Sequence, residues 1–218
     1  NLIPGWTQDI NQAGEPVKSK LRQLCLLKLL YYYGGMIVPS SFLCLNNLSS
    51  FYDESLRGNK PFVVENRNKY FTGSNDVQFM PDVSFMGAPK ENEIINQMIH
   101  FGQSLLSKDL TSESIFLGEY NKWCLSAFNM NQINIVNGLQ IGVKDLDNKP
   151  IFVEDLFENK YLNLPMNKSL IGIYIPADEL LNRPNINWFC YEKIENILTG
   201  DTAISKYFIL AKAPCFKI

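Results

Sequence analysis

Apolar and polar residues follow one another along this chain in patterns that predict helices separated by short strands. Residues 17–33 place Leu21, Leu24 and Leu27 on a helical period, and Gly34 is expected to end this helix. Short apolar runs of the kind that form strands occur at 36–38, 42–45, 61–65, 78–86 and 169–175. Further helical segments are predicted at 91–106, 119–131, 178–181 and 192–210.

Two apolar segments in the middle of the chain favour strands. Residues 133–143 and 149–157 are rich in Ile, Val and Phe, and we expect them to form strands or a hairpin around Gly138. Residues 1–16 hold two prolines and two glycines and are predicted to be a loop. Strands that alternate with helices, without a clear linker, favour an α/β or α+β layered domain.

The composition supports a packed core and argues against several partners. Hydrophobic residues make up 46% of the 218 residues and aromatic residues 12%. The net charge of −2 and the lack of a basic block argue against nucleic acid as a partner. The longest apolar run, 24–33, contains Lys28 and is shorter than the roughly 20 residues of a membrane span. No secretory signal precedes it, so secretion by a signal of its own is not expected.

The five cysteines are scattered, odd in number and never in a C-x-x-C spacing. This pattern favours a reducing compartment and argues against a zinc site and a disulfide framework. The chain begins with Asn1 and not with Met, so we expect it to be a piece of a longer protein.

Two stretches of the chain resemble the sugar-binding region of GT-A-type glycosyltransferases, a group that includes initiating mannosyltransferases and capsular-polysaccharide transferases. The first runs from residues 18–22 (KSKLR) through 33–35 (YGG) and a short strand to 39–41 (PSS) and the apolar residues 43–48. The second is 82–90 (DVSFMGAPK), which precedes a predicted helix.

The resemblance implies a GT-A-like (Rossmann-type) α/β fold, with a mixed sheet flanked by helices. It would form a single domain over residues 1–218, made of an N-terminal loop (1–16), a part similar to the sugar-binding region (17–110) and a C-terminal part (111–218). The strand–helix–strand unit that holds the nucleotide base in such folds is missing from these residues.

The chain departs from the family where the family binds its metal. An Asp-x-Asp triplet is expected after the strand, and Pro39, Ser40 and Ser41 stand there instead. Mg²⁺ and Mn²⁺ prefer anionic oxygen ligands, so no divalent metal is expected, and a nucleotide sugar would bind only to an active enzyme. The family's histidine near a tryptophan also has no counterpart beside Trp188.

Matching the family's motif gives a set of candidate substrate-binding residues, namely Arg22, Gly34, Gly35, Ser40 and Ser41. Two carboxylates that flank the second stretch are candidates for a general base, Asp76 and Asp82. Each also has a structural interpretation: a helix end for the glycine pair, a turn for the serines, a salt bridge for the arginine and hydrogen-bonded carboxylates for the aspartates.

These departures predict a glycosyltransferase-like protein that has lost its metal site and is a non-catalytic structural or interaction protein. The abundance of Asn, Ile and Lys resembles proteins of large DNA viruses. The expected partners are therefore other proteins, among them capsid or virion proteins, and the expected location is the host cytoplasm or the virion. A scaffold of this kind predicts a large apolar contact patch.

Two alternatives remain open at this point. An active, metal-independent transferase would neutralise the leaving diphosphate with Lys18, Lys20 and Arg22, and predicts basic groups converging near Ser40 and Ser41. A sugar-binding module would use Tyr32, Trp188 or both, and predicts an exposed aromatic side chain at a shallow cleft.

Overall fold

The chain is a mixed α/β protein in which helices flank a mixed sheet. The structure, a computed structural model, describes residues 2–67, 79–108, 113–165 and 167–212. It forms two compact units: the first comprises Asn1–Val38 and Tyr52–Val136, the second Pro39–Phe51 and Asn137–Ile218. Over the described ranges, no helix has both the length and the apolar character that crossing a membrane would take.

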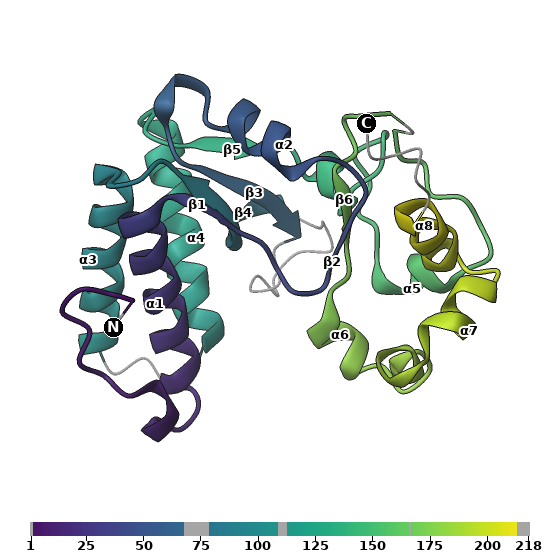
Figure 1. The fold of residues 1–218 in the computed structure, drawn as a ribbon, viewed down its shortest axis with the longest axis horizontal. Helices are drawn as coiled ribbons and strands as arrows, with labels where there is room; N and C mark the ends of the chain where they lie inside the picture. Colours follow the sequence, from purple (N-terminus) through teal and green to yellow (C-terminus); the bar gives the residue numbers. More distant parts are fainter. Residues whose placement is uncertain (1, 68–78, 109–112, 166, 213–218) are drawn as a thin grey trace. The chain divides into compact units, whose positions relative to one another are not determined.

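Over the residues that the structure describes, the first unit contains three long helices and four strands (Figure 1). Its 3₁₀ helices are η1 (Ile10–Gln12) and η2 (Arg57–Asn59). Helix α2 (Leu48–Ser55) runs across the boundary between the units. The other elements are α1 (Val17–Tyr33), β1 (Gly35–Ile37), β3 (Phe62–Arg67), β4 (Phe79–Ala88), α3 (Glu93–Ser107), α4 (Glu113–Asn129) and β5 (Asn134–Val136).

The sheet of the first unit has the strand order β1-β4-β3-β5. Strand β4 pairs antiparallel with β1 and β3, and β5 runs parallel to β3. The register between β3 and β4 shifts inside the strands: Val63 lies opposite Met86, but Val64 lies opposite Asp82. Such an irregularity changes the direction in which side chains of the bulged strand point.

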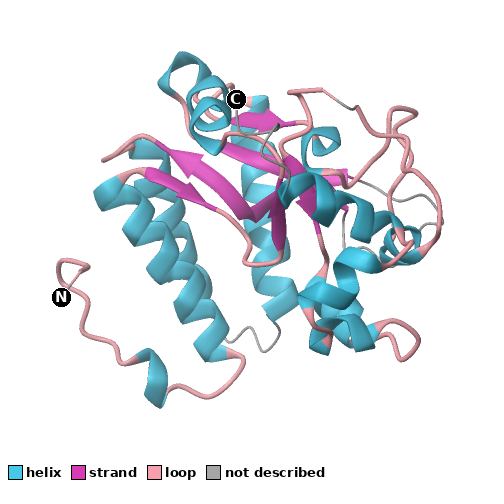
Figure 2. Cartoon of the chain, turned by 45° about the vertical axis from the view of Figure 1, so that its right-hand side comes forward, coloured by secondary structure: helices cyan, strands magenta, loops and turns pink. Residues whose placement is uncertain are grey.

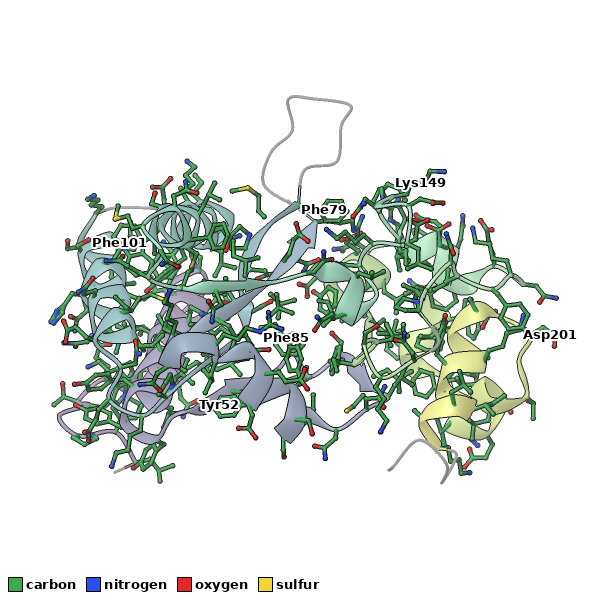
Figure 3. The ribbon with its side chains drawn as sticks, turned by 90° about the horizontal axis from the view of Figure 1, so that it is seen from above. Tyr52, Phe79, Phe85, Phe101, Lys149 and Asp201 are labelled. Carbon is green, nitrogen blue, oxygen red and sulfur yellow. The ribbon has the colours of Figure 1, made fainter. Side chains whose placement is uncertain are left out.

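Helices α1 and α4 pack on the sheet of the first unit, and α1, α3 and α4 pack on one another (Figure 2). Leu24, Leu27 and Leu30 of α1 lie at helical spacing and are buried. They join a core of buried side chains from the helices and the sheet, which also includes Val63, Val83, Met86, Ile95, Met98, Ile99, Leu105, Phe116 and Tyr120. Phe101 of α3 (Figure 3) adds ring contacts to Tyr120 and Trp123 of α4, with centroids 5.7 and 6.2 Å away.

The second unit is built from short elements around its own core. Strands β2 (Phe42–Cys44) and β6 (Gly172–Tyr174) form an antiparallel pair. The remaining elements are η3 (Gly138–Ile141), α5 (Val153–Phe157), α6 (Ala177–Leu181), η4 (Asn187–Tyr191), α7 (Ile194–Thr199) and α8 (Ala203–Lys212). Their buried side chains include Leu45, Val153, Leu156, Leu164, Ile173, Leu180, Ile204 and Tyr207.

Most sequence-predicted elements are confirmed, including the helix at 17–33 and the strands around 36–38, 61–65, 78–86 and 169–175. The helix expected at 119–131 is confirmed as α4, which begins earlier, at Glu113, and ends at Asn129. One prediction is wrong. The strands expected at 133–143 and 149–157 are limited to β5, because 138–141 forms a 3₁₀ helix and 153–157 forms α5.

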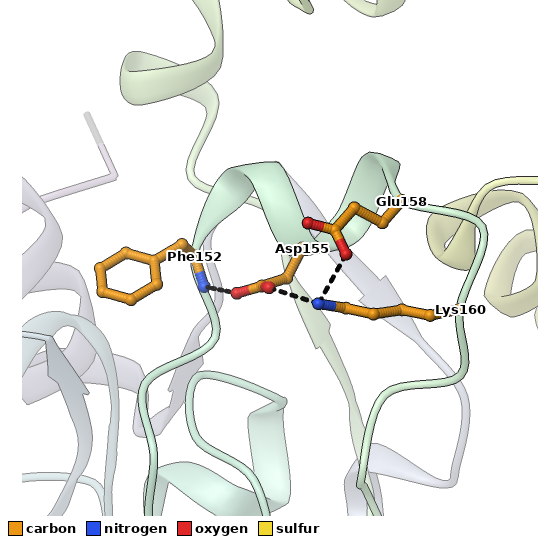
Figure 4. Close-up of polar contacts among 4 residues, drawn as sticks. All are labelled: Phe152, Asp155, Glu158 and Lys160. Carbon is orange, nitrogen blue, oxygen red and sulfur yellow. Dashed lines mark hydrogen bonds and ion pairs between the residues drawn. The ribbon is translucent and has the colours of Figure 1, made fainter.

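Local hydrogen bonds explain why 153–157 is helical despite its strand-like composition (Figure 4). The Asp155 carboxylate accepts the backbone N–H of Phe152 at 2.7 Å, which satisfies one of the free donors at the helix start. The Lys160 ammonium contacts the carboxylates of Asp155 and Glu158 at 2.7 and 2.8 Å. It therefore links a side chain of the helix to the residue that follows the last turn.

Candidate functional site

The glycine pair after α1 forms a tight backbone corner. Gly34 has a φ of 68° and closes the helix by donating its N–H to the Leu30 carbonyl at 2.8 Å. A Cβ at Gly34 would lie 2.7 Å from the backbone nitrogen of Lys90. Gly35 has a φ of 96° and lies opposite Ala88 in the pairing of β1 with β4. The positive φ values account for both glycines without a ligand, and the close approach of the Lys90 backbone is a second reason for a glycine at position 34.

The Tyr52 hydroxyl (labelled in Figure 3) joins the corner to the neighbouring strand. The backbone N–H of Gly35 donates to the Tyr52 oxygen at 3.2 Å, and the Tyr52 hydroxyl donates to the Ala88 carbonyl at 2.8 Å. This bridge satisfies polar groups of β1 and β4 through a side chain from α2. The polar groups of the corner therefore form hydrogen bonds that stabilise the fold.

Arg22 and Lys20 of α1 have different surroundings. The Arg22 guanidinium lies 3.7 Å from the Glu15 carboxylate, and both side chains are more than half exposed. Hydrogen bonds from Ser19, together with the charge of Arg22, lower the pKa of Glu15. Lys20 is buried, with its ammonium 5.9 Å from the centre of the Phe116 ring. Arg22 therefore makes the surface ion pair that its structural interpretation predicts.

Asp82 is held by hydrogen bonds in the middle of β4. One oxygen accepts from the Asn66 side-chain amide at 2.7 Å, and the other accepts from the Ser84 backbone N–H at 2.9 Å. The carboxylate is half-buried, and Asn66 is buried. Asp76, the other candidate general base, lies outside the described residues.

The buried thiol of Cys124 on α4 lies within electrostatic reach of Asp82. Burial raises the pKa of Cys124, and the negative charge of Asp82 raises it further. A thiol with a raised pKa is a poor nucleophile at neutral pH. Burial, and then the neighbouring Cys124, also raise the pKa of Tyr120. The raised pKa values therefore make Cys124 a poor nucleophile and Tyr120 a poor proton donor at neutral pH.

The serines at the position of the family's metal triplet belong to the second unit, whereas Arg22 and the glycine pair belong to the first. Residues 39–42 form a turn, in which the Phe42 N–H donates to the Pro39 carbonyl at 3.1 Å. Ser40 is exposed, and the Ser41 carbonyl accepts the Ile175 N–H at 3.1 Å. Searching the described part of the chain for three or more His, Cys, Asp or Glu side chains that could hold a metal ion finds no such group.

Two further features of the described residues bear on function, and among their exposed aromatic side chains only Trp188 was singled out from the sequence. One is a pocket of about 300 Å³ in the first unit, which residues 5–8 line together with side chains of α1 and α3. The other is a set of exposed apolar side chains at residues 181–194 of the second unit. The combination of Trp188 and Tyr191 in one short segment was a visible signal for the second feature. The pocket had none, because it depends on where the N-terminal segment packs.

Comparison with models of protein families, with curated proteins and with solved structures gives no match to this chain.

Proposed function

We propose that this chain is a non-catalytic interaction protein on a GT-A-like framework, and that it binds another protein through exposed apolar side chains around η4. The observation that carries the proposal is the exposure of Leu181 (48%), Trp188 (48%), Tyr191 (79%) and Ile194 (46%). We name these four side chains the η4 surface. These four side chains lie on the consecutive elements α6, η4 and α7, and a protein partner would remove their apolar area from water.

The local structure prepares the η4 surface for binding. Trp188 and Tyr191 are three residues apart in a 3₁₀ helix, where side chains at that spacing lie on the same side. The Trp188 ring meets Phe157 and Phe189 edge-on, with both centroids 6.1 Å away. An aromatic side chain that is already held in place loses little conformational entropy on binding, so more of its burial energy contributes to affinity.

The contacts of the candidate site residues support the absence of catalysis. Gly34 and Gly35 are explained by backbone geometry, and Arg22 is paired with Glu15 at the surface. Asp82 is hydrogen-bonded to neighbouring groups of its own sheet. Fold and chemistry are separable, so a transferase framework without its site can serve as a binding scaffold.

The GT-A relationship and the kind of partner are further parts of the proposal. The sequence of helix, glycine pair and strand from α1 to β1 supports a GT-A-like arrangement. The mixed sheet of the first unit is compatible with it. Capsid or other virion proteins as partners, in the virion or the host cytoplasm, rest on the resemblance in composition alone.

Calorimetric titration with a panel of nucleotide sugars, with and without Mn²⁺, tests the loss of catalysis. We expect no binding under either condition. Micromolar binding without metal would overturn the non-catalytic assignment and support the metal-independent transferase, with Lys18, Lys20 and Arg22 as the phosphate contacts to test.

Affinity capture of partners, followed by titration of the purified partner, tests the η4 surface. We expect Trp188→Ala to weaken binding about 30-fold, because a central tryptophan contributes about 2 kcal/mol and each 1.4 kcal/mol is tenfold. Leu146→Ala is the matched control, since Leu146 is 52% exposed in the same unit and is not part of the η4 surface. Equal affinity of the Trp188 variant and the wild type would refute this surface as the interface.

A sugar-binding module is the second candidate, since Trp188 offers an exposed aromatic ring on which a sugar could stack. Tyr32 fits this role less well because it is half-buried and its ring meets Tyr31 edge-on at 5.3 Å. Saturable binding of free oligosaccharides that Trp188→Ala abolishes would favour this candidate over a protein partner.

A further inference from the structure

The pocket of the first unit has the chemistry of a site for a small organic molecule. Its volume of about 300 Å³ is at the lower end of the range for ligand pockets. Trp6, Leu24 and Leu106 supply apolar lining, while Thr7, Lys28 and Gln103 supply polar groups. We propose that this pocket binds a small organic anion, a carboxylate or a phosphate ester with a flat apolar body.

Lys28 is the charged side chain among the described residues that line the pocket. The Lys28 ammonium lies 5.3 Å from the centre of the Trp6 ring. Over the described residues, Lys28 forms no ion pair, and no acidic side chain lines the pocket. The Lys28 side chain is half-buried. A cation–π contact with the indole ring does not neutralise the positive charge of its ammonium, so part of that charge stays uncompensated. An anionic oxygen would gain a charge-assisted hydrogen bond there.

The apolar half of the pocket is held in place before any ligand arrives. Trp6 packs against the core of the first unit, and its indole N–H donates to the Gln8 carbonyl at 2.6 Å. Its backbone N–H donates to the Ile3 carbonyl at 3.2 Å. The N-terminal segment is therefore folded over α1 and α3 by its own contacts, and a ligand does not have to order it.

These two halves select the class of ligand. Trp6, Leu24 and Leu106 favour a ligand with an apolar body, and the Lys28 ammonium favours an anionic group on that ligand. The Gln103 amide also lines the pocket and can donate a hydrogen bond. A cationic ligand would be repelled by Lys28, and a neutral one would leave the ammonium uncompensated. This inference concerns the first unit and does not rest on the proposed function of the η4 surface.

Titration of the intact chain with benzoate and with phenyl phosphate tests the proposal, with neutral benzamide as the comparison ligand. The readouts are calorimetry and the NMR signal of the Trp6 indole N–H, assigned with Trp6→Phe. We expect at least one anion to bind and to move this signal, and benzamide to bind more weakly. Lys28→Gln should weaken binding about tenfold or more, and Lys28→Arg should retain it.

Lys18→Gln is the matched control, because it removes the same charge from the same helix outside the pocket. It should leave the affinity unchanged. No binding of either anion up to about 10 mM would overturn the proposal. Benzamide binding as tightly as the anions, or an equal loss in the Lys18 and Lys28 variants, would also overturn it. A preference for benzoate assigns the site to carboxylates, and the reverse preference assigns it to phosphate esters.

Discussion

The Tyr52 hydroxyl is the group whose removal most directly tests how the α1–β1 corner is held. Tyr52→Phe keeps the ring, which lies edge-on to Phe62 with centroids 6.3 Å apart, and removes only the oxygen. The Gly35 N–H and the Ala88 carbonyl then each lose a partner, at 3.2 and 2.8 Å respectively. The variant therefore isolates two hydrogen bonds without creating a large cavity.

The expected cost follows from the burial of the two backbone groups. A hydrogen bond contributes about 0.5–1.5 kcal/mol, and an unsatisfied buried group costs more. Ala88 is fully buried, whereas Gly35 is half-buried and accessible to water. We expect Tyr52→Phe to lower the free energy of unfolding of the first unit by about 1–2 kcal/mol. With a urea dependence of about 2 kcal/mol per molar, the midpoint should fall by about 0.5–1 M.

Urea unfolding and amide hydrogen exchange at Gly35 measure this effect, and Tyr33→Phe is the control. Tyr33 is exposed and donates to the Leu2 carbonyl at 2.6 Å, so its variant should shift stability by less than about 0.5 kcal/mol. An unchanged midpoint together with unchanged protection of the Gly35 amide in the Tyr52 variant would refute the bridge as a stabilising contact.

Three further predictions concern the first unit. Gly34→Ala should lower the free energy of unfolding in urea by more than about 2 kcal/mol, because φ is 68° and the new Cβ would lie 2.7 Å from the Lys90 nitrogen. Gly14→Ala is the control and should be nearly neutral, because its Cβ would have nothing within 4 Å. Tyr120→Phe should leave the free energy of unfolding unchanged or raise it by up to about 1 kcal/mol, because the buried Tyr120 hydroxyl has no hydrogen-bond partner over the described residues. A clear fall in the melting temperature of this variant would contradict the prediction. The free energy of unfolding should fall as pH rises above about 9. Burial raises the pKa of Cys124 from its ordinary 9.0, so above that pH the unfolded chain releases a proton that the folded chain retains. Cys124→Ala should flatten the decline in the urea midpoint between about pH 9 and 11, and an identical slope would count against the assignment.

Local signals made the first part of the fold predictable. The leucines of α1 repeat at helical spacing, and the glycine pair supplies the φ values that the corner needs. Residues 153–157 could not be assigned in this way. Their apolar composition favours a strand, but Asp155 caps the start of α5, and Val153 and Leu156 are buried three residues apart. A side-chain hydrogen bond and the tertiary packing outweighed the intrinsic preference.

The candidate site was less predictable, because its contacts depend on which segments meet. Asp82 reaches Asn66 in a ladder whose register shifts between Val63 and Val64, and no pattern in either strand encodes that shift. The bridge from Tyr52 to Gly35 and the position of Trp6 over α1 likewise join residues that are distant in the sequence. The sequence identified candidate residue types, and the fold determined which groups they contact.

The chain path of the second unit has a consequence for synthesis on the ribosome. Strand β2 precedes most of the first unit in the sequence, whereas its partner β6 follows all of it, with Phe42 opposite Tyr174. At about 5–20 residues per second, roughly 7–26 s separate the emergence of the two strands. During that interval the backbone groups that β2 pairs with β6 have no strand partner, while the rest of the first unit is synthesised. A nascent chain arrested before β6 would therefore expose a strand edge, which chaperones or a neighbouring chain could pair with before the native partner exists.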